Sequence, residues 1–79
     1  MEKIEVTAHF DIEGRITPQK IVWQGHSFNV EGTGRRWEAK NKKHILVMVA
    51  GNQIFHLIFD LQTYIWKLVT NNGINFSGN

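Results

Sequence analysis

The sequence predicts an all-β fold, a single small antiparallel meander of five or six strands that forms a partly open barrel or a compact sandwich. Short apolar runs are separated by glycine-containing turns, and the first run alternates strictly between apolar and polar residues. Val, Ile, Phe and Trp are prominent among the apolar residues, and Pro occurs once. With 79 residues, 42% of them hydrophobic, the chain is long enough for one domain with one modest core.

The first predicted strand runs from Ile4 to Ile12. Its apolar residues recur at every second position, which indicates one face toward the core and one toward water. Glu13-Gly14 follows as a turn. Pro18 is expected at the start of the second strand or on an edge, because proline has no backbone N–H to donate.

The segment "KIVWQGHSFNV" predicts a hairpin with Gly25-His26 as a two-residue loop of type II′. In this register the apolar residues share one face of the hairpin, and two oppositely charged residues pair on the other face. It places Trp23 opposite Phe28, Ile21 opposite Val30, and Lys20 opposite Glu31.

Residues 44–70 predict a three-stranded meander. Gly51-Asn52 is the expected loop of its first hairpin, and "DLQTY" is the second turn. The expected pairs are Met48 with Phe55, Leu46 with Leu57, Val47 with His56, Phe59 with Trp66, and Leu57 with Leu68.

The domain is expected to comprise residues 1–70, with residues 71–79 as a turn-rich C-terminal tail in which Ile74 and Phe76 could add a short edge strand. The predicted core contains Val6, Phe10, Ile21, Trp23, Phe28, Val30, Trp37, Leu46, Met48, Phe55, Leu57, Phe59, Trp66 and Leu68.

The strands of the meander are apolar on both faces. Ile45, Val47, Val49, Ile54 and Ile58 leave an apolar face opposite the predicted core, and such strands need cover on both sides. We therefore expect a homodimer in which a second copy covers that face, although the tail folded back would do the same.

Few residues suggest chemistry. There is no cysteine for a disulfide or a thiolate zinc site, and Ser27 beside His26 lies in a tight turn where a nucleophile–base pair is not expected. None of the four histidines follows a metal-binding spacing, although His44 and His56 lie on paired strands and are the pair to test. The sequence predicts no enzyme activity, no cofactor and no metal.

The N-terminus lacks the pattern of a signal peptide, and no apolar run reaches the roughly 20 residues that span a membrane. We therefore expect a cytoplasmic protein with no membrane partner.

Positive charge is concentrated in the middle of the chain. The segment "GTGRRWEAKNKKH" surrounds Trp37 with five basic residues, although Glu38 interrupts the run. Basic loops beside aromatic residues are typical of nucleic-acid-binding β domains, but Trp37 also fits a core plug beside a solvated loop. The candidate nucleic-acid-binding residues of this loop are Arg35, Arg36, Lys40, Lys42 and Lys43.

Over residues 15–70 the chain carries the patterns P-x-x-I-x-W-x-G-x-x-F-x-V, from Pro18 to Val30, then F-x-L at Phe55 and W-x-L at Trp66. These patterns resemble an uncharacterised family of small bacterial β domains that stand alone or are associated with Y-family DNA-polymerase-like repair proteins. The resemblance implies a β fold and a DNA-associated or protein-interaction role, and it supplies no catalytic residues. This chain has His26 and His56 where that family commonly has an arginine and an acidic residue.

Together these observations favour a non-enzymatic interaction or scaffold module that self-associates. The alternative is a small nucleic-acid-binding module that uses the basic Arg35–Lys43 loop.

Overall fold

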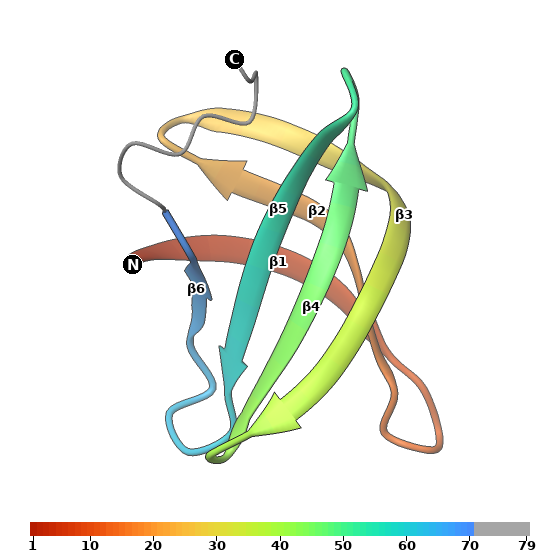
Figure 1. The fold of residues 1–79 in the computed structure, drawn as a ribbon, viewed down its shortest axis with the longest axis vertical. Helices are drawn as coiled ribbons and strands as arrows, with labels where there is room; N and C mark the ends of the chain where they lie inside the picture. Colours follow the sequence, from red (N-terminus) through yellow and green to blue (C-terminus); the bar gives the residue numbers. More distant parts are fainter. Residues whose placement is uncertain (71–79) are drawn as a thin grey trace.

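The computed structural model describes residues 1–70, which form six antiparallel strands joined as a meander and closed into a small barrel (Figure 1). The predicted all-β meander is confirmed, and β1 pairs with β6 to close the barrel. The tail at 71–79 and its suggested edge strand lie outside the described residues. The strands are β1 (Glu2–Phe10), β2 (Ile16–Trp23), β3 (His26–Ala39), β4 (Lys42–Val49), β5 (Gln53–Asp60) and β6 (Trp66–Leu68). Residues 1–70 include no helix long and apolar enough to cross a membrane.

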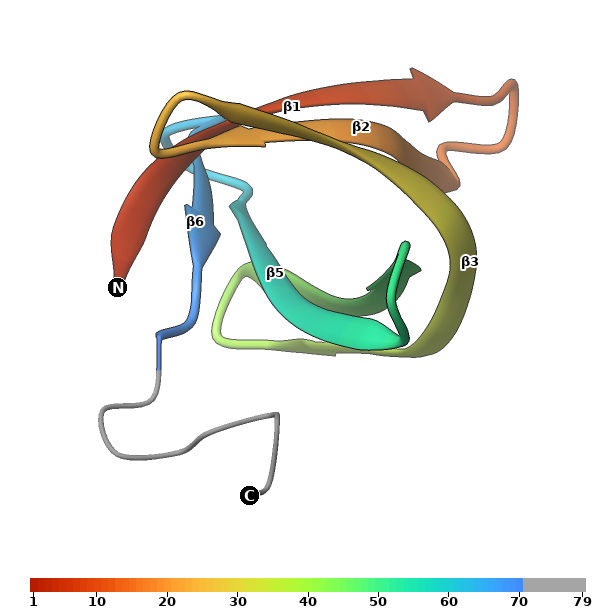
Figure 2. The same ribbon diagram turned by 90° about the horizontal axis from the view of Figure 1, so that it is seen from above.

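Strand β3 joins the two sides of the barrel. Figure 2 shows it curving from the side formed by β1 and β2 to the side formed by β4 and β5. Its pairing with β4 shifts register between Val30 and Gly32 and again between Thr33 and Arg36, and such bulges bend a strand. Because β3 pairs with β2 only over His26–Asn29, its second half leaves β2 and runs with β4 alone.

The predicted register of the first hairpin is wrong by two residues, because the loop lies one residue earlier than predicted. The loop is Gln24-Gly25, and Trp23 pairs with His26 while Ile21 pairs with Phe28. Both loop residues have positive φ, 51° and 78°, as a type I′ turn requires, whereas the predicted type II′ turn needs it only at the first position.

The register predicted for the β4–β5 hairpin is also wrong. Three residues, 50–52, separate the strands, so that Val47 pairs with Phe55 and Ile45 with Leu57. A shift of one residue turns a strand over. The predicted faces of β4 are therefore exchanged: Ile45, Val47 and Val49 of the predicted dimer face point into the core, and Met48 of the predicted core is 42% exposed.

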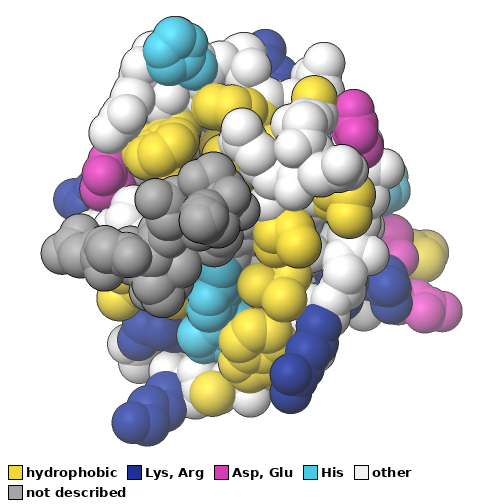
Figure 3. Space-filling model, turned by 45° about the horizontal axis from the view of Figure 1, so that its top comes forward, with side chains coloured by type: hydrophobic (Ala, Val, Ile, Leu, Met, Phe, Trp, Pro, Cys, Tyr) yellow, Lys and Arg dark blue, Asp and Glu magenta, His cyan; other side chains and the backbone are white. Residues whose placement is uncertain are grey.

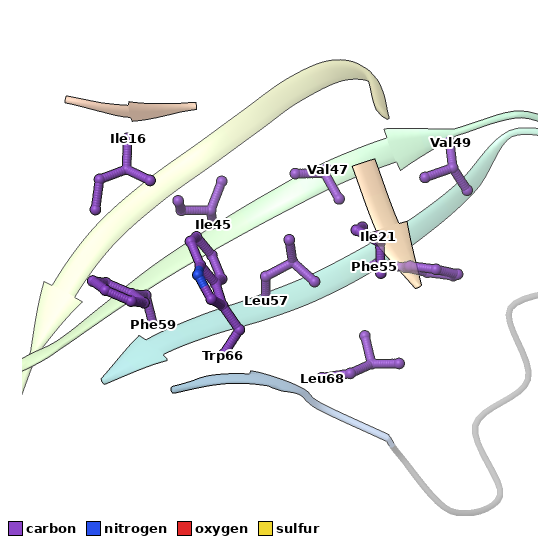
Figure 4. Packing of buried hydrophobic residues seen from close by; sticks show 10 residues of the cluster. All are labelled: Ile16, Ile21, Ile45, Val47, Val49, Phe55, Leu57, Phe59, Trp66 and Leu68. Atoms are coloured by element: carbon purple, nitrogen blue, oxygen red, sulfur yellow. The ribbon is translucent and has the colours of Figure 1, made fainter. Parts of the chain in front are cut away.

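The second turn of the meander was predicted correctly, with Phe59 opposite Trp66 and Leu57 opposite Leu68. Figure 4 shows the buried side chains converging on the space between the strands. This core consists of Ile16, Ile21, Ile45, Val47, Val49, Phe55, Leu57, Phe59, Trp66 and Leu68.

Several residues of the predicted core lie elsewhere. Phe10 is 55% exposed and contacts Phe59 edge-on at the barrel rim, with 6.0 Å between ring centroids. Leu46 and Trp37 are half-buried on the outside. Pro18 is fully buried in β2, opposite Ala8, where a register shift in the β1–β2 ladder accommodates a residue without an N–H.

We predict that Ile21→Ala lowers the free energy of unfolding by about 2–5 kcal/mol, because Ile21 has no exposed surface and its loss leaves a cavity. The matched control is Ile12→Ala. Ile12 is fully exposed, so this change should cost about 0.5 kcal/mol or less. Urea titrations followed by tryptophan fluorescence measure both values, and equal costs would contradict the assignment of the core.

Candidate functional site

The basic segment predicted as a loop is a strand hairpin. Arg35 and Arg36 lie in β3, Lys42 and Lys43 begin β4, and the turn between the strands contains Lys40. Lys40 and Asn41 both have positive φ, 54° and 62°, which again matches a type I′ turn. The hairpin is therefore part of the barrel wall rather than a free arm.

Three of the five cations make polar contacts with other residues between 1 and 70. Arg36 donates a hydrogen bond to the backbone carbonyl of Ile16. The Nζ of Lys42 lies 3.9 Å from Asp60, and that of Lys43 lies 3.2 Å from Glu38. Because alternate residues of a strand point to opposite faces, these cations are dispersed over two sides of the hairpin.

Trp37 lies on the outer surface, where its ring is stacked on His44 at a centroid distance of 5.0 Å and an interplanar angle of 10°. The guanidinium of Arg35 lies 5.2 Å from the same ring. The prediction that Trp37 plugs the core is wrong. Trp37 pairs with His44, which alternates with the inward-facing Ile45.

His44 and His56 form a direct hydrogen bond, with 2.9 Å between Nδ1 of the first and Nε2 of the second. His44 pairs across the strands with Ile58, so His56 is its diagonal neighbour on the same face. The pKa of His56 is lowered by burial and, to a smaller extent, by the charge of His44. Two imidazoles that share one hydrogen bond cannot both be protonated without breaking it.

As a metal site, the pair of His44 and His56 would offer only two nitrogen ligands, one from each imidazole. Among residues 1–70, no three His, Cys, Asp or Glu side chains come together in an arrangement that could hold a metal ion.

Apolar side chains continue from this pair along the outer surface of β4 and β5. We call this surface the outer face and define it by Leu46, Met48, Ile54, His56 and Ile58, of which Ile58 is buried. Met48 and Ile54 are cross-strand partners and are 42% and 44% exposed. Figure 3 shows histidine side chains beside a band of apolar side chains that is bordered by Lys or Arg.

A second feature is a concave pocket of about 260 Å³ between the start of β2 and the β3–β4 hairpin. Arg15, Arg36 and Lys43 contribute cations to it, and Glu38 is its acidic residue. Arg36 and Lys43 belong to the predicted basic set, but Arg15 does not. No signal in the sequence links Arg15 to residues more than twenty positions away, because only the barrel topology brings the two segments together.

Comparison of this chain with protein-family models, curated proteins and solved structures finds no match. The resemblance to the family of small bacterial β domains therefore stays a prediction, and the geometry of the candidate site is the basis for a proposed function.

We predict that the protein loses stability as the pH falls below about 6.5, the ordinary pKa of histidine. Because the pKa of His56 is lowered in the folded state, the unfolded state binds more protons between the two pKa values. The stability contribution is thus present above that window and is lost as the pH falls through it. Urea midpoints at about pH 7.5 and about pH 5 measure the effect.

His56→Gln is the control for this prediction and should reduce the difference between the two midpoints. Asp11 and Asp60 also have lowered pKa values, each mainly through backbone hydrogen bonds to its carboxylate, but their window lies below 3.8 and does not interfere. An equal pH response in the variant and the wild type would contradict the assignment to His56.

Proposed function

We propose that this chain is a non-enzymatic interaction module that self-associates through the outer face. The observation that carries the proposal is the pair of Met48 and Ile54, two apolar side chains that face each other across β4 and β5 and remain more than two-fifths exposed. Half-buried Leu46 extends the same apolar surface. A contiguous apolar patch of this kind favours contact with another protein.

A second copy of the chain can pack on the outer face because the face carries no charged residue that would repel its counterpart. None of its five residues is Lys, Arg, Asp or Glu, so two copies meet across a two-fold axis without repulsion between formal charges when the histidine is neutral. Packing of one sheet face on another also requires no free strand edge.

The proposal also retains the expectations of no catalytic activity and a cytoplasmic location. Ser27 and His26 are both exposed beside the tip of the first hairpin. Within residues 1–70, the side chains of Ser27 and His26 form no hydrogen bond with each other.

Nucleic-acid binding by Arg35, Arg36, Lys40, Lys42 and Lys43 is the second candidate. It is supported by the surface position of Arg35 on Trp37, because an arginine and an aromatic ring together suit contact with an unpaired base. The carboxylates near Lys42 and Lys43 reduce the charge that those lysines offer to phosphates. Binding of this kind weakens steeply with salt, whereas apolar self-association hardly responds.

We predict that the wild-type protein has twice the mass of the 9.2 kDa chain in sedimentation equilibrium, and that Met48→Lys converts it to monomers. The reason is that a lysine at the centre of the interface would bury a charge with no partner. Ile12→Lys is the matched control, since it places the same charge at an exposed apolar residue in the β1–β2 turn and should leave the dimer intact.

Circular dichroism establishes whether the Met48 variant keeps its fold. A wild-type protein that sediments as a monomer would overturn self-association. Dissociation by both variants would show that added charge, rather than the outer face, controls the assembly.

A further inference from the structure

We propose that the pocket formed by Arg15, Arg36 and Lys43 binds the phosphate group of a phosphomonoester. Three cations and one carboxylate line a concavity of about 260 Å³. This leaves an excess of positive charge at one end of the barrel, on residues that are separate from the outer face.

Arg36 lines the pocket and is half-buried. It sits where β3 has left β2, and its hydrogen bond to the carbonyl of Ile16 spans the opening between these strands. A guanidinium has five N–H donors in a rigid fork, and this carbonyl accepts from one of its nitrogens. The bond therefore fixes the side chain while other donors remain to bind an oxyanion.

Arg15 is placed opposite by an ordered turn. The carboxylate of Asp11 accepts hydrogen bonds from the backbone N–H groups of Glu13, at 2.9 Å, and Arg15, at 2.8 Å. The backbone N–H of Asp11 donates to the carbonyl of Arg15 at 3.0 Å. These bonds fix the backbone from which the Arg15 side chain reaches the pocket.

The two guanidinium groups carry like charges and line the same pocket. The pKa of Arg36 is lowered mainly by burial and further by the charge of Arg15. An anion between them would relieve this repulsion and accept charge-assisted hydrogen bonds from both.

Lys43 is the third cation. Its ion pair with Glu38 is exposed, and exposed pairs contribute little stability, so the ammonium can turn toward an anion at small cost. Three cations and the carboxylate of Glu38 leave a net charge of 3 − 1 = +2, which a dianionic phosphomonoester matches better than a singly charged carboxylate does. Trp37 and His44 also line the pocket.

The test is a titration with inorganic phosphate followed by ¹H–¹⁵N NMR, with sodium chloride replaced to hold the ionic strength constant. We expect saturable shifts at the amides of residues 15, 16, 36 and 43. Arg15→Gln should weaken binding about tenfold, the effect of losing one charge-assisted hydrogen bond. Lys40→Gln removes one charge from the same hairpin outside the pocket and should change the affinity by less than about twofold.

A second arm of the test measures phosphate binding by Arg36→Lys. This variant keeps the positive charge but lacks the planar guanidinium, whose paired N–H donors carboxylates and phosphates prefer. It should also weaken phosphate binding, and the NMR spectrum reports whether the fold is intact. Met48→Lys should leave phosphate binding unchanged, so that failure of this inference and failure of the self-association proposal are distinguishable.

Absence of saturable shifts would overturn the inference, as would equal losses in Arg15→Gln and Lys40→Gln, which would indicate only a general attraction of anions. A single-stranded oligonucleotide forms the last arm. If it binds without displacing phosphate, the phosphate site is separate from the nucleic-acid surface and the inference holds. If it displaces phosphate and its affinity falls equally in both variants, the pocket is part of a nucleic-acid surface and the inference is overturned.

Discussion

The register of β4 against β5 determines what each side of this barrel presents. With Ile45 opposite Leu57 and Val47 opposite Phe55, four side chains that are buried enter the core from the two central strands. The alternate residues of β4 must then face outward, which brings His44 into contact with His56 and leaves Met48 exposed. A shift by one residue would bury these outer residues and expose Ile45 and Val47.

Strand β3 gives the barrel its second surface feature, the pocket. Its 14 residues are too many to pair with one neighbour, and two register shifts bend it from β2 to β4. The same bend opens a gap beside Ile16, and Arg36 spans this gap. The pocket is therefore a consequence of how a six-stranded meander closes, while the outer face is a consequence of strand register.

The fold could be predicted from the sequence because each strand is bounded by turn residues and the topology follows chain order. The pairing of Phe59 with Trp66 could also be predicted, since only one turn register brings the apolar residues of β5 and β6 together. The register of β4 could not be predicted, because this strand is apolar on both faces and the sequence pattern fits either register equally well. In the first hairpin, Gln24-Gly25 and Gly25-His26 both supply a turn glycine, and the two registers differ by two residues, so each keeps the same side chains on the same face and the apolar pattern favours neither.

The candidate sites could likewise be predicted only in part: the residues could be identified from the sequence, but their contacts could not. Arg36 and Lys43 could be identified from charge alone, and His44 with His56 from their positions on paired strands. Their actual contacts depend on a diagonal relation across the sheet and, for Arg15, on segments that meet only after the barrel closes. Local patterns do not specify such relations.

Closure itself depends on a very short element. β6 contributes three residues, yet it is the only strand that joins β1 to β5 in the described part of the chain. Of the six described strands it is also the last to leave the ribosome. Until it arrives, the edges of β1 and β5 have unpaired backbone N–H and C=O groups, which can pair with other chains. The growing chain is thus exposed to intermolecular strand pairing from the emergence of β1 until a tripeptide that follows the other five described strands closes the barrel.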